Sequence, residues 1–238
     1  MTAVKKNCGV VFCSYFFLAL AFGWSILWTI ALVGIWDETI TCEQVGNVNQ
    51  CSQPNYGILF GMFVSYFFTH QVIQNTIHVV VAGVVGTWWF APDEASSCCS
   101  AGICDSMKRA LTTSFGSICF GSLIVAIIQA LRALANSARA NDDGNAILVC
   151  IAECILQCLE SIVQYFNKWA FIYVGLYGYS YLEAGKNVIT LFKNRGWEAI
   201  IADDLVSNTL FFVSVVVGGL AGAVGLILSR TTDWFEQA

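Results

Sequence analysis

One stretch of the chain carries amide and imidazole side chains at helical spacing inside an apolar region. The residues that follow the i, i+3, i+4, i+7 pattern of one helical face are Gln71, Gln74, Asn75 and His78. His70 and Thr69 lie close beside this face. Such groups cost free energy in hydrocarbon unless they face a partner helix or a water-filled cavity, so one interpretation is a substrate path. The alternative is hydrogen bonding between helices, which is worth about 1 kcal/mol per contact and needs no ligand.

A second stretch places tyrosines at successive i+4 steps and follows them with a carboxylate. The tyrosines are Tyr173, Tyr177 and Tyr181, and the carboxylate is Glu183. A quaternary ammonium ion cannot donate a strong hydrogen bond, so proteins recognise it through aromatic ring faces and diffuse negative charge. The pattern therefore suits an organic cation. An interfacial aromatic belt, with Glu183 paired locally to Lys186, explains the same residues without a ligand.

The motifs of several enzyme classes are missing from the sequence. It contains no G-x-x-x-x-G-K-[ST] nucleotide loop, no H-E-x-x-H and no G-x-S-x-G. The two histidines have no acidic partner nearby in the sequence. We expect no enzymatic activity and no cofactor, and the cysteine spacing indicates no metal site.

The elements that position these residues must be membrane helices. Of the 238 residues, 57% are hydrophobic and 11% are charged, and the mean hydropathy is +0.68. This composition excludes an ordinary soluble domain, and a net charge of -5 without a basic run excludes nucleic acid as a partner. The expected partner is the lipid bilayer.

We predict an all-α polytopic fold that forms a single membrane domain over residues 1–238. The five expected spans are residues 9–36, 56–91, 110–131, 165–187 and 205–229. The polar residues Glu153, Gln157, Glu160 and Gln164 share one helical face, which predicts an interfacial amphipathic helix over residues 146–164. Residues 165–187 are interrupted by Lys168 and Glu183, so that segment either spans or is re-entrant.

The positions of Lys and Arg beside the spans favour a cytoplasmic N-terminus, because cytoplasmic loops carry the excess of these residues. With this orientation the cytoplasmic residues are Lys5, Lys6, Lys108, Arg109, Lys186, Lys193 and Arg195. Those on the other face are Arg132, Arg139, Lys168 and Arg230. We expect the plasma membrane as the location, with an organelle membrane as the alternative.

The eleven cysteines are interpreted by location, since most lie in or beside predicted helices. Cys42 and Cys51 share the acidic loop expected outside, where a disulfide between them is an even alternative to free thiols. The group Cys98, Cys99 and Cys104 could accept palmitate, but free small hydrophobic side chains are the favoured interpretation. Cys150, Cys154 and Cys158 form a stripe that indicates packing or lipid contact.

Pairs of small residues four apart predict close helix contacts. These pairs are Ser117 with Gly121, and Gly218 with Gly222.

Several long runs of the sequence closely resemble the choline transporter-like solute carriers. The runs are SFGSICFGSLIVAIIQALR at 114–132, YFNKWAFIYVGLYGYSY at 165–181, AGKNV at 184–188, QVIQN at 71–75, Ala82-Gly83 and TWWF at 87–90. Further agreement comes from the cysteine-bearing loop before them and from Asp203-Asp204-Leu205 before the Gly-rich last span. The resemblance covers nearly all of the chain and is greatest for compact fungal, plant and protist members.

This resemblance implies a membrane protein that moves choline, or a related ethanolamine-like cation, without ATP hydrolysis. The family has about ten spans, and this chain resembles only the later half, so the resemblance implies a fragment of a longer carrier whose site lies between halves. The partners to consider are therefore the missing remainder of that carrier or a second copy of the chain.

The expected function is a facilitative or secondary transporter for choline or a related small organic cation. The substrate-binding candidates are His70, Gln71, Gln74, Asn75, His78, Tyr173, Tyr177, Tyr181 and Glu183. The alternatives are a non-transporting membrane scaffold and an inactive truncated product.

Overall fold

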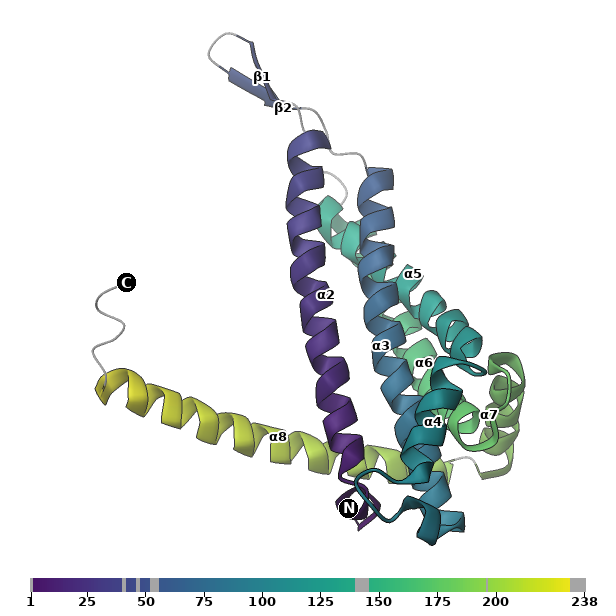
Figure 1. The fold of residues 1–238 in the computed structure, drawn as a ribbon. Coiled ribbons are helices and arrows are strands. Elements are labelled where there is room, and N and C mark those ends of the chain that lie inside the picture. The colour runs from purple at the N-terminus through teal and green to yellow at the C-terminus, as the bar shows by residue number, and fades with distance from the viewer. Residues whose placement is uncertain are drawn as a thin grey trace. The chain divides into compact units, whose positions relative to one another are not determined.

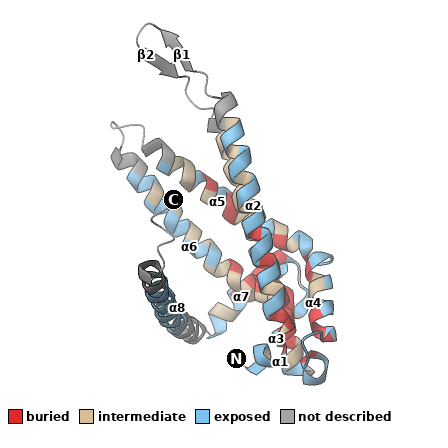
Figure 2. Ribbon diagram, turned by 60° about the vertical axis from the view of Figure 1, so that its left-hand side comes forward, coloured by how far each residue is buried: buried red, intermediate tan, exposed pale blue. Residues whose placement is uncertain are grey.

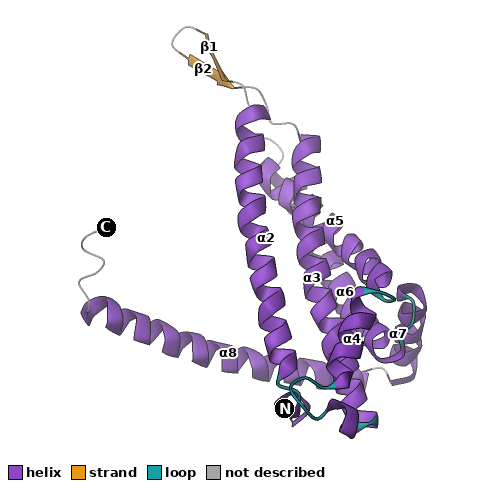
Figure 3. Ribbon diagram, viewed as in Figure 1, coloured by secondary structure: helices purple, strands orange, loops and turns teal. Residues whose placement is uncertain are grey.

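The structure of the chain is a computed structural model, and in the described residues its regular elements are helices and one short hairpin (Figure 3). It describes the backbone of residues 2–39, 42–45, 48–51, 56–139, 146–195 and 197–231. Side chains are described for residues 2–35, 57–136, 150–195 and 208–225. The predicted all-α class is confirmed.

The chain divides into two units, Met1–Val188 and Ile189–Ala238, and each is described by itself. The second unit contains α8, Trp197–Thr231, a helix of 35 residues. The expectation of a single membrane domain stays a prediction. The helix packing expected at Gly218 and Gly222 of α8 also stays a prediction.

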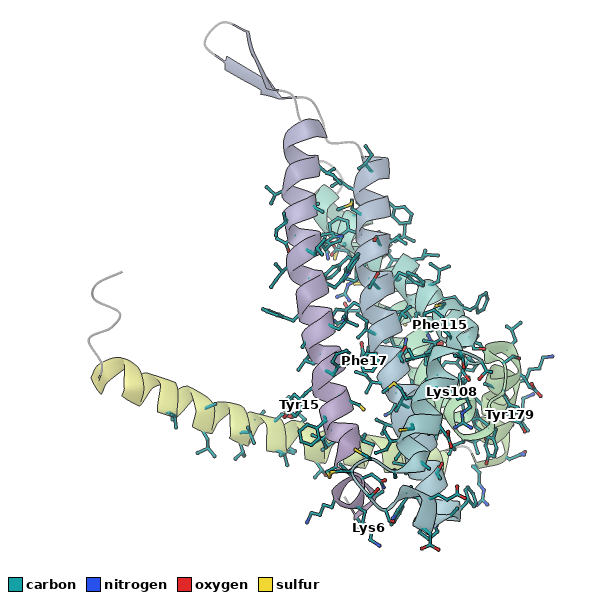
Figure 4. All side chains as sticks on the ribbon, viewed as in Figure 1. Lys6, Tyr15, Phe17, Lys108, Phe115 and Tyr179 are labelled. Carbon is teal, nitrogen blue, oxygen red and sulfur yellow. A yellow bond between two sulfur atoms is a disulfide. The ribbon has the colours of Figure 1, made fainter. Side chains whose placement is uncertain are left out.

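The first unit begins with the short helix α1, Thr2–Lys6, followed by two long antiparallel helices that lie side by side (Figure 1). These are α2, Gly9–Thr39, and α3, Tyr56–Phe90. The indole Nε1 of Trp28 in α2 donates to the carbonyl of Met62 in α3 at 3.0 Å. Phe17 of α2 packs with Ala21 and with Ile73 of α3 (Figure 4).

Between α2 and α3 the chain forms an antiparallel hairpin of β1, Cys42–Val45, and β2, Val48–Cys51. The backbone register places Cys42 opposite Cys51. The side chains of this hairpin lie outside the described residues, so the disulfide expected between the two cysteines stays a prediction.

Four further helices follow the 3₁₀ turn η1, Pro92–Ala95, and the first unit includes the last of them only as far as Val188. They are α4, Ala101–Leu111; α5, Phe115–Arg139; α6, Ala146–Tyr177; and α7, Tyr181–Arg195. Helix α3 is central, because it packs against α2, α4, α5 and α6. Its buried side chains include Val79, Val80 and Val84, and Figure 2 shows buried residues gathered on α3 and the helices packed against it.

Four helices in the described part of the chain are long and apolar enough to cross a membrane. Their spanning stretches are Gly9–Ile35, Gly57–Phe90, Phe115–Asn136 and Asn208–Gly225. On α2, the aromatic side chains of Phe12, Phe16 and Phe22 are exposed, as expected for a helix that faces lipid. These stretches correspond to four of the five expected spans.

The region of the remaining expected span differs from the sequence-based division. One helix, α6, runs without a break through the expected boundary at residue 164 and ends at Tyr177. The break comes at Gly178, whose φ of 72° is the left-handed conformation that commonly ends a helix. Ser180 then starts α7, since its hydroxyl accepts the N–H of Glu183 at 3.4 Å. The backbone therefore changes direction at Gly178 and Ser180, and not at the predicted interruptions Lys168 and Glu183.

Hydrogen bonds and a disulfide join the residues before α2 to the connection between α3 and α4. The Nδ2 of Asn7 donates to the carbonyl of Ala95 at 2.6 Å, and the Ser100 hydroxyl donates to Asn7 Oδ1 at 3.1 Å. Asn7 is only 1% exposed. Cys8 forms a disulfide with Cys98, so the expectation that Cys98 is a free thiol is wrong. The pairing was missed because its partner lies 90 residues away in the sequence.

We predict that Gly9→Ala destabilises the protein, because a Cβ at Gly9 would collide with the carbonyl oxygen of Cys98 and reach 3.0 Å from Ile103 Cδ1. Overpacking of this kind costs about 1–3 kcal/mol. The measurement is the melting temperature of the detergent-solubilised protein by fluorescence-detected size exclusion. Gly23→Ala is the matched control in the same helix, where a Cβ meets nothing within 4 Å among the described residues. Equal melting temperatures for the two variants would show that the close contact between Gly9 and Cys98 does not stabilise the protein.

Candidate functional site

A polar cavity of about 540 Å³ lies among α3, α5 and α6. Its lining residues are Gln71, Gln74, Asn75, His78, Val125, Ser161, Gln164, Tyr165, Asn167 and Lys168. The four residues predicted to share one helical face, Gln71, Gln74, Asn75 and His78, are all among them. We call these four residues the α3 stripe. The helical spacing of these residues places them on one face, and α5 and α6, which pack against α3, cover part of that face, while Gln74 stays exposed.

Two stripe residues also make hydrogen bonds between helices. The Nδ2 of Asn75 donates to the Ser122 hydroxyl of α5 at 2.9 Å, and both residues are buried. The Nε2 of Gln71 donates to Gln129 Oε1, also in α5, at 3.3 Å. Gln71 and Asn75 therefore do both: each makes a hydrogen bond to a neighbouring helix, and each lines the cavity.

His70 faces a different space from the α3 stripe. It lines an apolar cavity of about 580 Å³ between α2 and α3, together with residues such as Phe17, Ile73 and Ile77. Gln74 borders both this cavity and the polar one. The structure thus gathers Gln71, Gln74, Asn75 and His78 in one site and places His70 beside it.

Sequence reasoning missed a set of polar residues that continues from Gln71. Gln129 Nε2 donates to Glu160 Oε1 at 2.9 Å, and Glu160 Oε2 pairs with Arg132 Nη1 at 2.9 Å. Gln164 Nε2 also donates to Glu160 Oε1, at 3.0 Å. The signal in the sequence is the i, i+4 spacing of Glu160 and Gln164, which by itself predicts only a polar face on an interfacial helix.

The predicted single face of Tyr173, Tyr177 and Tyr181 is wrong, because α6 ends at Tyr177 and α7 begins at Tyr181. Tyr173 and Tyr177 do lie together, with ring centroids 5.6 Å apart, but Tyr177 stacks next on Tyr179 at 5.5 Å (Tyr179 is labelled in Figure 4). Tyr181 turns inward instead and is 8% exposed. The aromatic face therefore does not extend to Tyr181.

Tyr181 holds the start of α7 against α5 and α6. Its hydroxyl donates to Asn167 Oδ1, and Asn167 Nδ2 donates to the carbonyl of Gly121 at 3.1 Å. Its backbone N–H donates to the Ser117 hydroxyl at 3.2 Å. A Cβ at Gly121 would come within 2.8 Å of Phe171 Cζ, so the absent side chain permits this close contact.

Glu183 is exposed in the first turn of α7. A carboxylate there stabilises the positive end of the helix dipole, and its own N–H is capped by Ser180. Glu183 is not among the described residues that line the polar cavity. Its observed contacts therefore explain its position without a ligand.

The remaining cysteines in the described part of the chain are free thiols. Cys99, Cys104, Cys150, Cys154 and Cys158 are all exposed. Within the described residues, no group of three or more His, Cys, Asp or Glu side chains is arranged to hold a metal ion.

We predict that Tyr181→Phe lowers the free energy of unfolding by about 1 kcal/mol, because it leaves buried Asn167 without the hydroxyl donor. Tyr177→Phe serves as the control, since that side chain is 56% exposed. Melting temperatures of the two purified variants provide the comparison. A Tyr181→Phe variant as stable as Tyr177→Phe would show that the hydroxyl bond does not hold α7.

Comparison with known proteins agrees with this architecture. The family model described as "Plasma-membrane choline transporter" matches residues 1–237. A CTL-like protein of Dictyostelium discoideum is 34% identical over 233 residues, which cover 97% of this chain and 40% of that protein. Protein PNS1 of Candida albicans is 36% identical over 181 residues, which cover 74% of this chain and 35% of that protein. Protein PNS1 of Gibberella zeae is 35% identical over 227 residues, covering 90% of this chain and 41% of that protein.

The chain thus spans about two fifths of the length of these relatives. The match nevertheless extends over almost every residue of the chain, and it includes the central helix and the polar cavity. The chain belongs to the choline transporter family, whose model it matches from residue 1 to residue 237, and is a multi-pass membrane protein.

Proposed function

We propose that this chain takes part in moving choline, or a related small organic cation, across a membrane without ATP hydrolysis. The polar cavity among α3, α5 and α6 is the observation that carries this proposal. Polar residues inside membrane helices are expensive in free energy and commonly line substrate pathways. The family description names a choline transporter, which supports this substrate class.

The residues proposed to contact the substrate along the path are Gln71, Gln74, Asn75 and His78. Amides and an imidazole offer hydrogen bonds to a substrate hydroxyl, and they replace part of the water shell that a cation loses on entering the membrane. His70, Tyr173 and Tyr177 are secondary candidates, because His70 lines the neighbouring apolar cavity and the rings of Tyr173 and Tyr177 lie together. Membership of a transporter family favours transport over catalysis.

We further propose the plasma membrane as the location and a cytoplasmic N-terminus. The positive residues Lys5 and Lys6 precede α2, and Lys108 and Arg109 lie in the last turn of α4. Cytoplasmic loops carry the excess of Lys and Arg, which supports this orientation. The lipid bilayer, a second copy and the remainder of a longer carrier are the proposed partners.

The test of transport is labelled choline uptake by cells that express the protein from its complete gene. We expect saturable uptake above cells with an empty vector. A linear, non-saturable uptake equal to that of the vector control would count against a choline transporter.

Variants of the cavity separate transport from a scaffold role. We predict that Gln74→Ala and His78→Ala each raise the KM for choline several-fold while membrane yield stays near that of the wild type, because both side chains line the cavity. Gln157→Ala is the control, since Gln157 is exposed on α6. If the membrane yield of Gln74→Ala and His78→Ala falls and their KM for choline does not change, these side chains serve only helix packing.

A further inference from the structure

A second, smaller polar cavity contains the ion pair of the site. It has a volume of about 220 Å³ and is lined by Phe67, Gln129, Arg132, Ala133, Asn136 and Glu160. Phe67 comes from α3, the next four residues from α5, and Glu160 from α6. The cavity thus uses the same three helices as the larger one.

Glu160 is held by donors from two helices. Arg132 and Gln129 reach it from α5 at 2.9 Å each, and Gln164 reaches it from its own helix at 3.0 Å. Its side chain is 12% exposed, whereas that of Arg132 is 36% exposed. The Glu160 carboxylate is therefore the more buried partner. The Arg132 guanidinium is the partner with room to move away from the ion pair.

The two polar cavities meet at this group of side chains. Gln71, which lines the larger cavity, donates to Gln129, which lines the smaller one. Gln164 lines the larger cavity and donates to Glu160 in the smaller one. The 3.3 Å hydrogen bond between Gln71 and Gln129 therefore joins the linings of the two cavities.

The smaller cavity offers the chemistry that recognises a small organic cation. A cation without strong hydrogen-bond donors binds to the face of an aromatic ring and to diffuse negative charge. Phe67 and Glu160 supply a ring and a carboxylate to the same space. The larger cavity contains Lys168 and, among its described lining residues, no carboxylate.

We propose that the smaller cavity is the cation-binding site of the transport activity proposed above, on which this inference rests. Glu160 supplies the negative charge and Phe67 the aromatic contact. Arg132 occupies the carboxylate while the site is empty, and the incoming cation displaces it. The side chains of Gln129 and Gln164 keep the carboxylate in place during this exchange.

This exchange predicts effects of opposite sign for the two members of the ion pair. Glu160→Gln removes the negative charge, so the KM for choline rises at least tenfold. Arg132→Gln removes the competitor for the carboxylate, so the KM falls about threefold or more. A pair that only holds α5 to α6 would instead give the same loss of yield and activity for both variants.

The experiment measures choline uptake kinetics and inhibition by tetramethylammonium in cells expressing the protein from its complete gene. Phe67→Leu, which removes the ring but keeps an apolar side chain, raises the KM several-fold, and Phe67→Tyr restores it. Glu94→Gln is the matched control, because it makes the same change in an exposed carboxylate that lines neither of the two cavities. Its KM stays within twofold of the wild type.

The outcomes separate the two proposals. Saturable uptake by the wild type with an unchanged KM in Glu160→Gln overturns the cation site alone. A wild type without saturable uptake overturns the transport proposal, and the cation site with it. If Glu160→Gln does not accumulate in the membrane, the other two variants test the site. A raised KM in Arg132→Gln, or an unchanged KM in Phe67→Leu, overturns the cation site.

Discussion

The structure of the first unit depends on how the polar side chains of α3 are satisfied. Hydrocarbon offers no hydrogen bonds, so an amide inside an apolar helix must bond to a neighbouring helix or face a cavity that admits water. Asn75 bonds to Ser122 at 2.9 Å and Gln71 to Gln129 at 3.3 Å, both in α5. These bonds fix which face of α3 meets α5, and the same face lines the polar cavity.

Close backbone contact at glycines accompanies this polar face. A Cβ at Gly175 of α6 would lie 2.7 Å from the carbonyl of Val79 in α3, so the two helices approach closely only because the side chain is absent. Arg109 of α4 reinforces the contact, since its Nη2 donates to the Gly175 carbonyl at 2.6 Å. The two helices therefore approach closely at Gly175, while Gln71, Gln74, Asn75 and His78 of α3 line the polar cavity.

One ion pair and three glutamine side chains form a hydrogen-bonded network that spans α3, α5 and α6. Glu160 accepts from Arg132, Gln129 and Gln164, and Gln129 is in turn bonded to Gln71. Removing one partner of such a network leaves a polar group poorly solvated, so its members are coupled. These hydrogen bonds connect the linings of the two cavities.

Hydropathy and helical period are local properties of the chain, so the sequence alone predicted the all-α class, the four helices that are long and apolar enough to cross a membrane, and the shared face of Gln71, Gln74, Asn75 and His78 on α3. The family was predicted from the resemblance of long sequence runs. The sequence also contained the spacing of Glu160 and Gln164, but not the helix that they face. Only the tertiary structure paired Cys8 with Cys98, turned Tyr181 inward to Asn167 and brought Arg132 to Glu160. These contacts join residues far apart in the sequence or lie beyond the break at Gly178, where the backbone leaves the helical period on which a sequence pattern relies.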